Sequence, residues 1–432
     1  AGQIAHLHRA DGAGDQIGIC QRADAHHTVK AFLHHIHAAV AGADAYFQQR
    51  VGREEFGQFR KDDIPGQRVG HIDAQTASQP AGGRLEHGLQ LFQVGHQLLA
   101  AFEELLAQHL TDVARTALAT LRGKLAEQGL TALSVPEDCG GLGMDDVAWA
   151  LMSQELGYYA IPDSLADTAY VSAGLIKALP AGSHDREALL GRIADGSVRI
   201  AVGHPVNPLV ADAATADLLL LPHGDEVHLV PRALVDVTAN PSIDLSRRLA
   251  GLAWEPSSGT RIAAGDAGRR LWADALNRGT LSVAGQLLGL AQRMLDLSVD
   301  YAAQRKQFGK PIGSFQAVKH HLADVATRIE FAKPVLYRAA HALAHGTPAA
   351  AIHASHAKLA CGEAAWLAAR HGIQVHGAMG YTWEVDLQMF MKRTWALDAS
   401  WGDRGFHKSR VAGAILADGA AIGPGNTFEV QA

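Results

Sequence analysis

Apolar residues recur along this chain with two different spacings, and the change of spacing divides it into segments. Over residues 91–195 they lie three and four positions apart, as in Leu99–Leu106 and Leu118–Leu125. This period predicts amphipathic helices. A loop rich in Pro and Gly interrupts the pattern at Ser134–Gly143. We therefore expect a helical domain over residues 91–195.

The spacing changes over residues 196–265, where apolar residues form short runs bounded by prolines. Examples are Val198–Val202, Leu218–Leu221 and Val227–Val230. Short apolar runs between turn-forming residues predict strands. The expected structure is a small β-domain of four to six strands.

Long helical periods return over residues 266–420. The apolar positions step by four and three residues in two series, Val283, Leu287, Leu290, Met294, Leu297 and Tyr301, and Val318, Leu322, Val325 and Ile329. Stripes of this kind form the core of a helix bundle. We expect a C-terminal helix bundle here, followed by a tail at residues 421–432.

Residues 1–90 differ from the rest of the chain, because they are rich in His, Gln, Asp, Ala and Gly and show no long helical period. They are treated as an atypical extension. One hypothesis is that they are not native protein, since reading the wrong strand of GC-rich DNA turns common Leu and Val codons into Gln and His codons. A poorly ordered native extension and a metal-binding histidine tract are the alternatives.

The overall composition narrows the class of protein. The chain has 432 residues, of which 48% are hydrophobic and 19% charged, with a net charge of -6. A nucleic-acid binder would show a basic face instead. The three cysteines form neither a disulfide framework nor a zinc motif, which favours a reducing cytoplasm. We find no apolar run long enough to span a membrane, no signal peptide and no metal-ligand spacing.

Two runs in the C-terminal half carry the most specific chemistry. Gln374–Glu384 reads Gln-Val-His-Gly-Ala-Met-Gly-Tyr-Thr-Trp-Glu, and Arg305–Ile312 reads Arg-Lys-Gln-Phe-Gly-Lys-Pro-Ile. Each places glycine, which lets the backbone approach a ligand, beside an Arg or Gln able to bind phosphate or amide groups. With the loop Val135–Gly143 and the segment Asp244–Ala250, they resemble acyl-CoA dehydrogenases over roughly residues 98–420.

The resemblance implies a fold that is mainly α with a small β-domain. An N-terminal helical domain precedes a small β-barrel or β-sheet domain and a C-terminal four-helix bundle. It also implies an activity, the removal of hydrogen from Cα and Cβ of an acyl-CoA thioester. A carboxylate of raised pKa in a dry pocket takes the α-proton, and FAD takes the β-hydrogen as hydride. An electron-transferring flavoprotein usually collects the electrons.

In this family FAD lies extended across a subunit interface. The resemblance implies that the Arg305 guanidinium pairs with the flavin pyrophosphate, which its planar fork of donors suits. Phe308 would lie against the cofactor, and Gln316 would meet its adenosine half. Gln374, Gly377 and Ala378 would meet the same half from the neighbouring subunit. The full set expected to bind FAD is Arg305, Gln307, Phe308, Gln316, Gln374, Gly377 and Ala378. A surface salt bridge for Arg305 and a helix end at Gly377 are the alternatives.

The chain departs from the family where the catalytic base should be. The usual base is a Glu before a Gly, and the corresponding run here is Ser400-Trp401-Gly402. Some relatives carry the base on an earlier bundle helix, but that position is occupied by about Gly279. Asp403 is the best remaining candidate, although it could simply cap a helix. Asp274 and Glu384 are weaker candidates.

The variant runs around Trp383 and Trp401 resemble a subgroup of bacterial enzymes of steroid, dicarboxylate and aromatic-acid catabolism. There, two unlike subunits often form an α2β2 heterotetramer, in which one subunit supplies the base. The first interpretation is that this chain is the base-deficient, cytoplasmic subunit. The second is a self-sufficient homo-oligomeric enzyme that uses Asp403. The third is a scaffold subunit without flavin or turnover.

Overall fold

The computed structural model describes residues 120–420 apart from residue 245. The described residues from Arg122 onward belong to one compact unit. Three predictions lie outside the described residues: those for the extension 1–90, for the first predicted helix and for the tail 421–432.

The N-terminal segment begins with helical residues 120–127 and continues in short helical elements. They are η2 (Glu137–Cys139), α3 (Asp146–Tyr158), a π-helical turn η3 (Asp167–Ser172), α4 (Ala173–Lys177) and α5 (Arg186–Ala194). The carboxylate of Asp145 caps α3 by accepting hydrogen bonds from the backbone N–H groups of Val147 and Ala148, at 3.0 and 3.1 Å. The rings of Trp149 and Tyr170 stack with centroids 4.8 Å apart and join α3 to η3. Both rings are fully buried, so they form the core of this segment.

Strands follow in two small sheets. The strands are β1 (Ile200–Val202), β2 (Val210–Ala211), β3 (Leu218–His223), β4 (Glu226–Pro231), β5 (Val235–Asn240), β6 (Leu249–Trp254) and β7 (Arg261–Ala263). One sheet has the order β1-β3-β4-β7 and the other β2-β6-β5. β1 runs parallel to β3, and the remaining pairs in both sheets are antiparallel.

The prediction of four to six strands was therefore too low. β2 has two residues and β7 has three, and so short a strand cannot show an alternating pattern in the sequence. Both strands form by pairing with a longer neighbour. The buried side chains of Leu219, Leu221 and Val230 form part of the core of this β-domain.

Long helices make up the rest of the described chain. They are α6 (Gly265–Gln304), α7 (Gln316–Ala344), α8 (Ala350–His376), α9 (Leu387–Asp398) and α10 (Arg404–Ile415). Both predicted stripes are buried in part. Leu287, Leu290 and Met294 are fully inaccessible to solvent, whereas the half-buried positions are Leu297, Tyr301, Val318 and Leu322. Helix α3 packs directly on α6 at glycines: a Cβ on Gly289 would lie 1.9 Å from the carbonyl oxygen of Gln154. Glycine is needed there because the two backbones touch.

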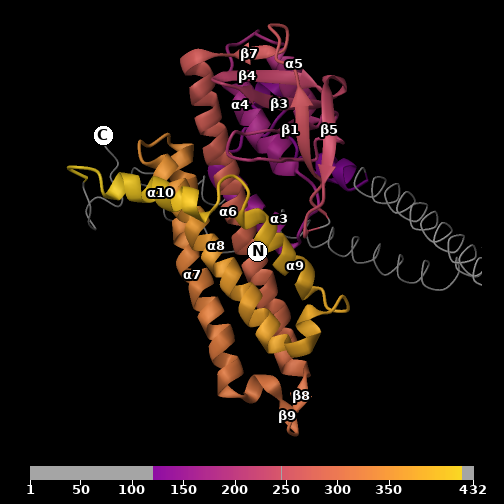
Figure 1. Cartoon of the computed structure of the whole chain (residues 1–432), viewed down its shortest axis with the longest axis vertical. Helices are drawn as coiled ribbons and strands as arrows, with labels where there is room; N and C mark the ends of the chain where they lie inside the picture. The colour runs from indigo at the N-terminus through magenta and orange to yellow at the C-terminus, as the bar shows by residue number, and fades with distance from the viewer. Residues whose placement is uncertain (1–119, 245, 421–432) are drawn as a thin grey trace, which may run out of the picture. The chain divides into compact units, whose positions relative to one another are not determined.

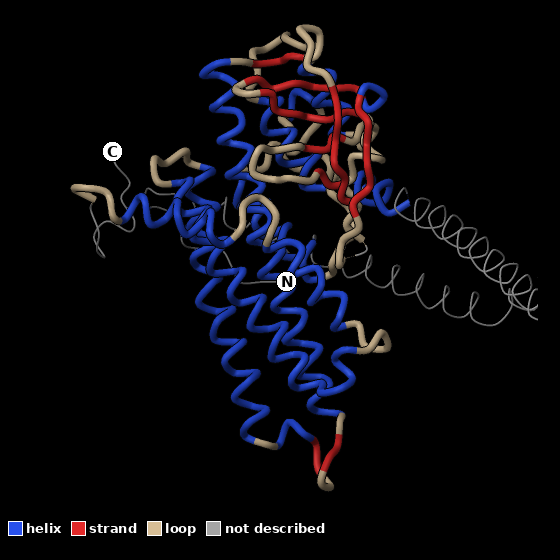
Figure 2. The backbone as a smooth tube through the Cα atoms, viewed as in Figure 1, coloured by secondary structure: helices blue, strands red, loops and turns tan. Residues whose placement is uncertain are grey.

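The strands lie beside the N-terminal part of α6, and the bundle extends from its C-terminal part (Figure 1). The hairpin of β8 (Lys306–Gln307) and β9 (Lys310–Pro311) lies at the far end of the bundle, between α6 and α7 (Figure 2). The predicted class, mainly α with a small β-domain, is confirmed.

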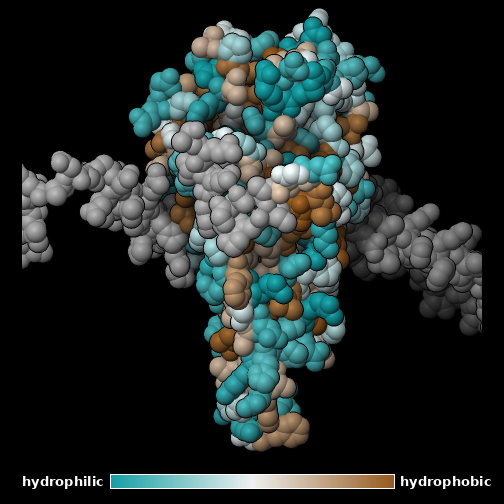
Figure 3. Space-filling model, turned by 90° about the vertical axis from the view of Figure 1, so that its left-hand side faces the viewer, coloured by the Kyte–Doolittle hydropathy of each residue, from teal (hydrophilic) through white to brown (hydrophobic). Residues whose placement is uncertain are grey.

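None of the helices in the described part of the chain combines the length and apolar character needed to cross a membrane. The face drawn in Figure 3 is mainly hydrophilic, with apolar residues in separate patches.

Candidate functional site

Trp401 and Gly279, the two positions that the resemblance assigns to a base, lie in direct contact. Trp401 stands between α9 and α10, and its side chain is 6% exposed. Gly279 is a buried residue of α6, and a Cβ placed on it would lie 2.1 Å from Cδ2 of the Trp401 indole. The indole therefore rests on the helix backbone. Neither position offers a group that can accept a proton from carbon.

The loop that carries Trp401 is held by a buried lysine on α8. Lys358 is 2% exposed. Its ammonium group donates hydrogen bonds to the backbone carbonyls of Gly402 at 2.8 Å, of Asp398 at 3.3 Å and of Ser400. Burial lowers the pKa of Lys358 to about 7. The three carbonyls satisfy the ammonium group and fix the course of the loop.

The backbone of Trp401 is fixed by side chains from other elements. Its N–H donates to Oδ1 of Asn207 at 2.7 Å. Its carbonyl lies 2.9 Å from Nε2 of His407, whose pKa is lowered to about 4 by burial and then by the charge of Lys358. A neutral His407 donates from Nε2 to this carbonyl. These contacts hold Trp401 at φ 55°, a left-handed conformation that is costly for a bulky residue.

A pocket opens beside the indole and is lined by charged side chains. Trp401 and Gly279 form part of its wall together with Asp163, Asp167, Asp212, Arg247, Arg248 and Arg393. Nη1 of Arg247 donates to the Ser400 hydroxyl at 2.7 Å, next to Trp401. The pocket volume is about 70 Å³, small beside ligand sites of about 300–1,000 Å³. In this state it has no room for a long acyl chain.

Asp167 is the acid in this pocket whose pKa is most clearly changed. Burial raises the pKa of its carboxyl group to about 7, while the charge of Arg247 acts in the opposite direction. Sequence reasoning missed Asp167. It lies in the short π-helical turn η3, and no spacing or motif marks that turn in the sequence.

The acids named from the sequence lie elsewhere. Oδ1 of Asp403 accepts a hydrogen bond from the backbone N–H of Phe406 at 2.8 Å, so the residue caps α10 and remains exposed. Asp274 and Glu384 are exposed as well. None of the three lines the pocket beside Trp401.

The residues predicted to bind FAD gather at the far end of the bundle. Arg305 follows the last residue of α6, and Gly377 forms the C-cap of α8 with φ 62°. The rings of Tyr301 and His376 stack with centroids 4.2 Å apart, which brings these two helix ends together. The structure therefore places both motif runs on one surface.

This surface suits a ligand with a pyrophosphate and a flat ring system. Among the described residues, the side chains of Arg305, Gln307, Gln316 and Gln374 are exposed and form no hydrogen bond or ion pair. Phe308 is 92% exposed at the tip of the hairpin, with φ 51°. A free guanidinium and free amides match phosphate oxygens and the polar edge of an adenosine. The chemistry of the donors thus fits FAD.

Comparison with known proteins agrees with this geometry. The family model described as the acyl-CoA dehydrogenase C-terminal domain matches residues 266–416, and the N-terminal domain model matches residues 96–197. The acyl-CoA dehydrogenase IpdE2 of Mycobacterium tuberculosis is 36% identical over 300 residues, which cover 67% of this chain and 87% of that protein.

Solved structures show the same fold. The butyryl-CoA dehydrogenase of Megasphaera elsdenii matches with a TM-score of 0.61 at 22% identity, over 69% of this chain and 90% of that one. The FAD complex of PigA matches with a TM-score of 0.63 at 20% identity, over 72% of this chain and 94% of that one. The chain is an oxidoreductase of the acyl-CoA dehydrogenase family, whose members bind FAD.

Proposed function

We propose that this chain is the base-deficient subunit of a heteromeric, FAD-dependent acyl-CoA dehydrogenase. The observation that carries the proposal is the contact between Trp401 and Gly279. Both positions at which the family places its glutamate meet here, and the indole fills the space between them. A second, unlike dehydrogenase subunit supplies the glutamate.

The chemistry explains why this contact matters. The α-C–H of a thioester is a weak acid, so its removal needs a carboxylate within reach and shielded from water. The indole N–H is a hydrogen-bond donor only. The small pocket beside Trp401 agrees with a site that does not receive the acyl chain.

The proposed contribution of this chain is to hold FAD at the subunit interface. Arg305 binds the pyrophosphate, Phe308 lies against the cofactor, and Gln316 and Gln374 bind its adenosine half. When bound, FAD supplies hydride acceptance, and an electron-transferring flavoprotein is the proposed electron acceptor. Support comes from the exposure of these side chains and the lack of partners for their polar groups among the described residues.

Co-expression tests the proposal. The chain is purified alone and together with a dehydrogenase subunit from the same genome that carries the usual Glu, and the visible flavin spectrum and acyl-CoA turnover are recorded. We expect flavin and turnover only in the co-purified complex, and unchanged turnover of the complex when Asp403→Asn is introduced. Turnover by the chain alone would overturn the base-deficient assignment. A colourless complex would favour a scaffold subunit.

A self-sufficient enzyme is the second candidate, and Asp167 is the observation that favours it. A carboxyl group with a pKa of about 7 lies in the same pocket as Trp401, and general bases work best near the operating pH. Under this candidate the chain alone turns over acyl-CoA, and Asp167→Asn abolishes turnover whereas Asp403→Asn does not.

A further inference from the structure

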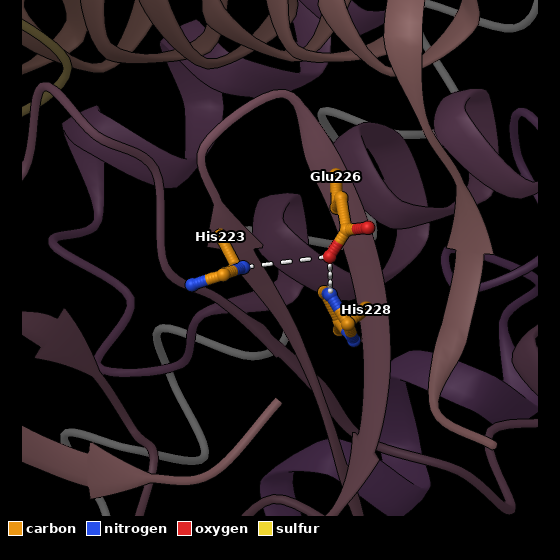
Figure 4. A group of neighbouring side chains, drawn as sticks. All are labelled: His223, Glu226 and His228. Atoms are coloured by element: carbon orange, nitrogen blue, oxygen red, sulfur yellow. Dashed lines mark hydrogen bonds and ion pairs between the residues drawn. The ribbon is translucent and has the colours of Figure 1, made fainter. Parts of the chain in front are cut away.

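Two histidines and a glutamate converge on the outer part of the β-domain, in the hairpin of β3 and β4. His223 and Glu226 form a cross-strand pair on either side of the two-residue turn Gly224–Asp225. His228 follows Glu226 by two positions and therefore lies on the same face of β4. Figure 4 shows the Glu226 carboxylate between the two imidazole rings. A short hairpin of paired strands holds all three side chains.

We propose that His223, Glu226 and His228 bind a zinc ion, with solvent at the fourth position. All candidate ligand atoms lie within 4.8 Å of one another. Oε2 of Glu226 lies 3.0 Å from Nε2 of His228 and 3.4 Å from Nδ1 of His223. In a tetrahedral zinc site with bonds of about 2.0–2.1 Å, neighbouring ligand atoms lie about 3.3 Å apart. Small side-chain rotations are sufficient to reach that geometry.

The hydrogen bonds around His228 are compatible with the tautomer that a metal ligand needs. The Thr260 hydroxyl donates to the carbonyl of Ser257 at 3.1 Å and lies 2.9 Å from Nδ1 of His228. Its oxygen is then free to accept a hydrogen bond from the Nδ1–H group. In this tautomer of a neutral His228, Nε2 is unprotonated and faces the Glu226 oxygen at 3.0 Å.

With Nδ1 protonated, the lone pairs of Nε2 and of the Glu226 carboxylate face each other. A metal ion satisfies both lone pairs at once. The alternative is a His228 that donates from Nε2 to Glu226 without a metal ion, and a measurement of bound metal separates the two.

The surroundings match those of known zinc ligands. Histidine ligands usually donate their second N–H to an oxygen, and Thr260 offers that oxygen to His228 in the tautomer with Nδ1 protonated. Nη1 of Arg261 binds the other Glu226 oxygen at 2.6 Å, which leaves Oε2 for the metal. The side-chain exposure rises from 1% at His228 through 22% at Glu226 to 61% at His223. The metal is therefore anchored at a buried residue and open to water on the outer side.

Zinc binding by the full chain tests the proposal. The protein is stripped with a chelator, equilibrated with Zn²⁺ and analysed for bound metal by mass spectrometry, with affinity from competition against a chromophoric chelator. We expect His223→Ala and Glu226→Gln each to hold one zinc ion fewer than the parent, or to weaken that site at least about tenfold. His223 is exposed, so its replacement leaves the fold intact, which thermal melting verifies.

The matched control is His341→Ala. His341 and His345 are exposed on another element, with rings stacked at 3.9 Å, and can bind zinc by themselves. If zinc occupies the hairpin, an anomalous scattering peak lies between His223, Glu226 and His228, and His341→Ala leaves it unchanged. If His223→Ala and Glu226→Gln bind as much zinc as the parent, the site is refuted.

Discussion

At the scale of single residues, the contact of Gly279 with Trp401 sets the chemistry of the site. Gly279→Ala should destabilise the fold by about 1–3 kcal/mol, because the new methyl group would overlap the indole. Gly413→Ala is the control: it lies on α10 with open space around its Cβ position, so we expect about 0.5–1 kcal/mol of stabilisation. Denaturant unfolding measures both. A Gly279→Ala chain as stable as the parent would show that the indole moves aside freely.

Asp167 makes stability depend on pH. Its folded-state pKa is about 7 against an ordinary value of 3.8, so the folded chain keeps a proton that the unfolded chain has lost. The contribution of Asp167 to the free energy of unfolding is complete below about pH 4 and falls as the pH rises toward 7. Roughly three pKa units amount to about 4 kcal/mol. The free energy of unfolding, measured between about pH 4 and 7, should fall in the parent and stay level in Asp167→Asn. If both proteins show the same dependence on pH, Asp167 is not its source.

At the scale of elements, Arg393 joins three parts of the described chain. The residue is on α9 and 6% exposed, and it pairs with Asp244 in the segment between β5 and β6. It also donates to the carbonyl of Ile161 at 3.1 Å, in the loop after α3. One guanidinium therefore connects the helical segment, the β-domain and the bundle.

Removing this connection should be costly. Arg393→Met leaves Asp244 as a buried, unpaired charge, so we expect about 3–5 kcal/mol of destabilisation. The control is Arg328→Met, which removes an exposed pair with Glu363 at 3.7 Å and should cost less than about 1 kcal/mol. Equal losses in thermal unfolding of the two variants would show that burial does not decide the value of the Arg393 pair.

At the scale of the whole molecule, assembly and flavin binding should share one surface. The hairpin after Arg305 carries the exposed Phe308, and the run after α8 carries the exposed Tyr381 and Trp383. Exposed aromatic groups of this kind are typical of protein interfaces. We therefore expect a partner subunit to cover the far end of the bundle and FAD to lie within the contact.

Phe308→Ser should lower the assembled mass in light scattering and the flavin content of the complex together. Leu234→Ser replaces an apolar residue that is 61% exposed on the β-domain, and should change neither. If Phe308→Ser lowers the flavin content but leaves the assembled mass unchanged, the cofactor lies outside the interface.

The predictable part of this structure is local. The long helices and the core stripe with Leu287 follow from spacing, since a buried helix face repeats every three or four residues. The strands β2 and β7 were not predicted because they are too short to carry a period. The pocket acid Asp167 and the cluster around Glu226 were missed for another reason. Neither belongs to a sequence motif, and each site exists only once the folded chain has brought its side chains together.

The sequence by itself determined the fold class, the family and the presence of Trp401 where a glutamate is usual, because these depend on residue identity and periodicity alone. Only the tertiary structure decided that Trp401 covers Gly279, that Asp403 caps a helix and that Asp167 lines the pocket. Which groups meet, and how far burial moves their pKa values, depends on neighbours distant in the chain.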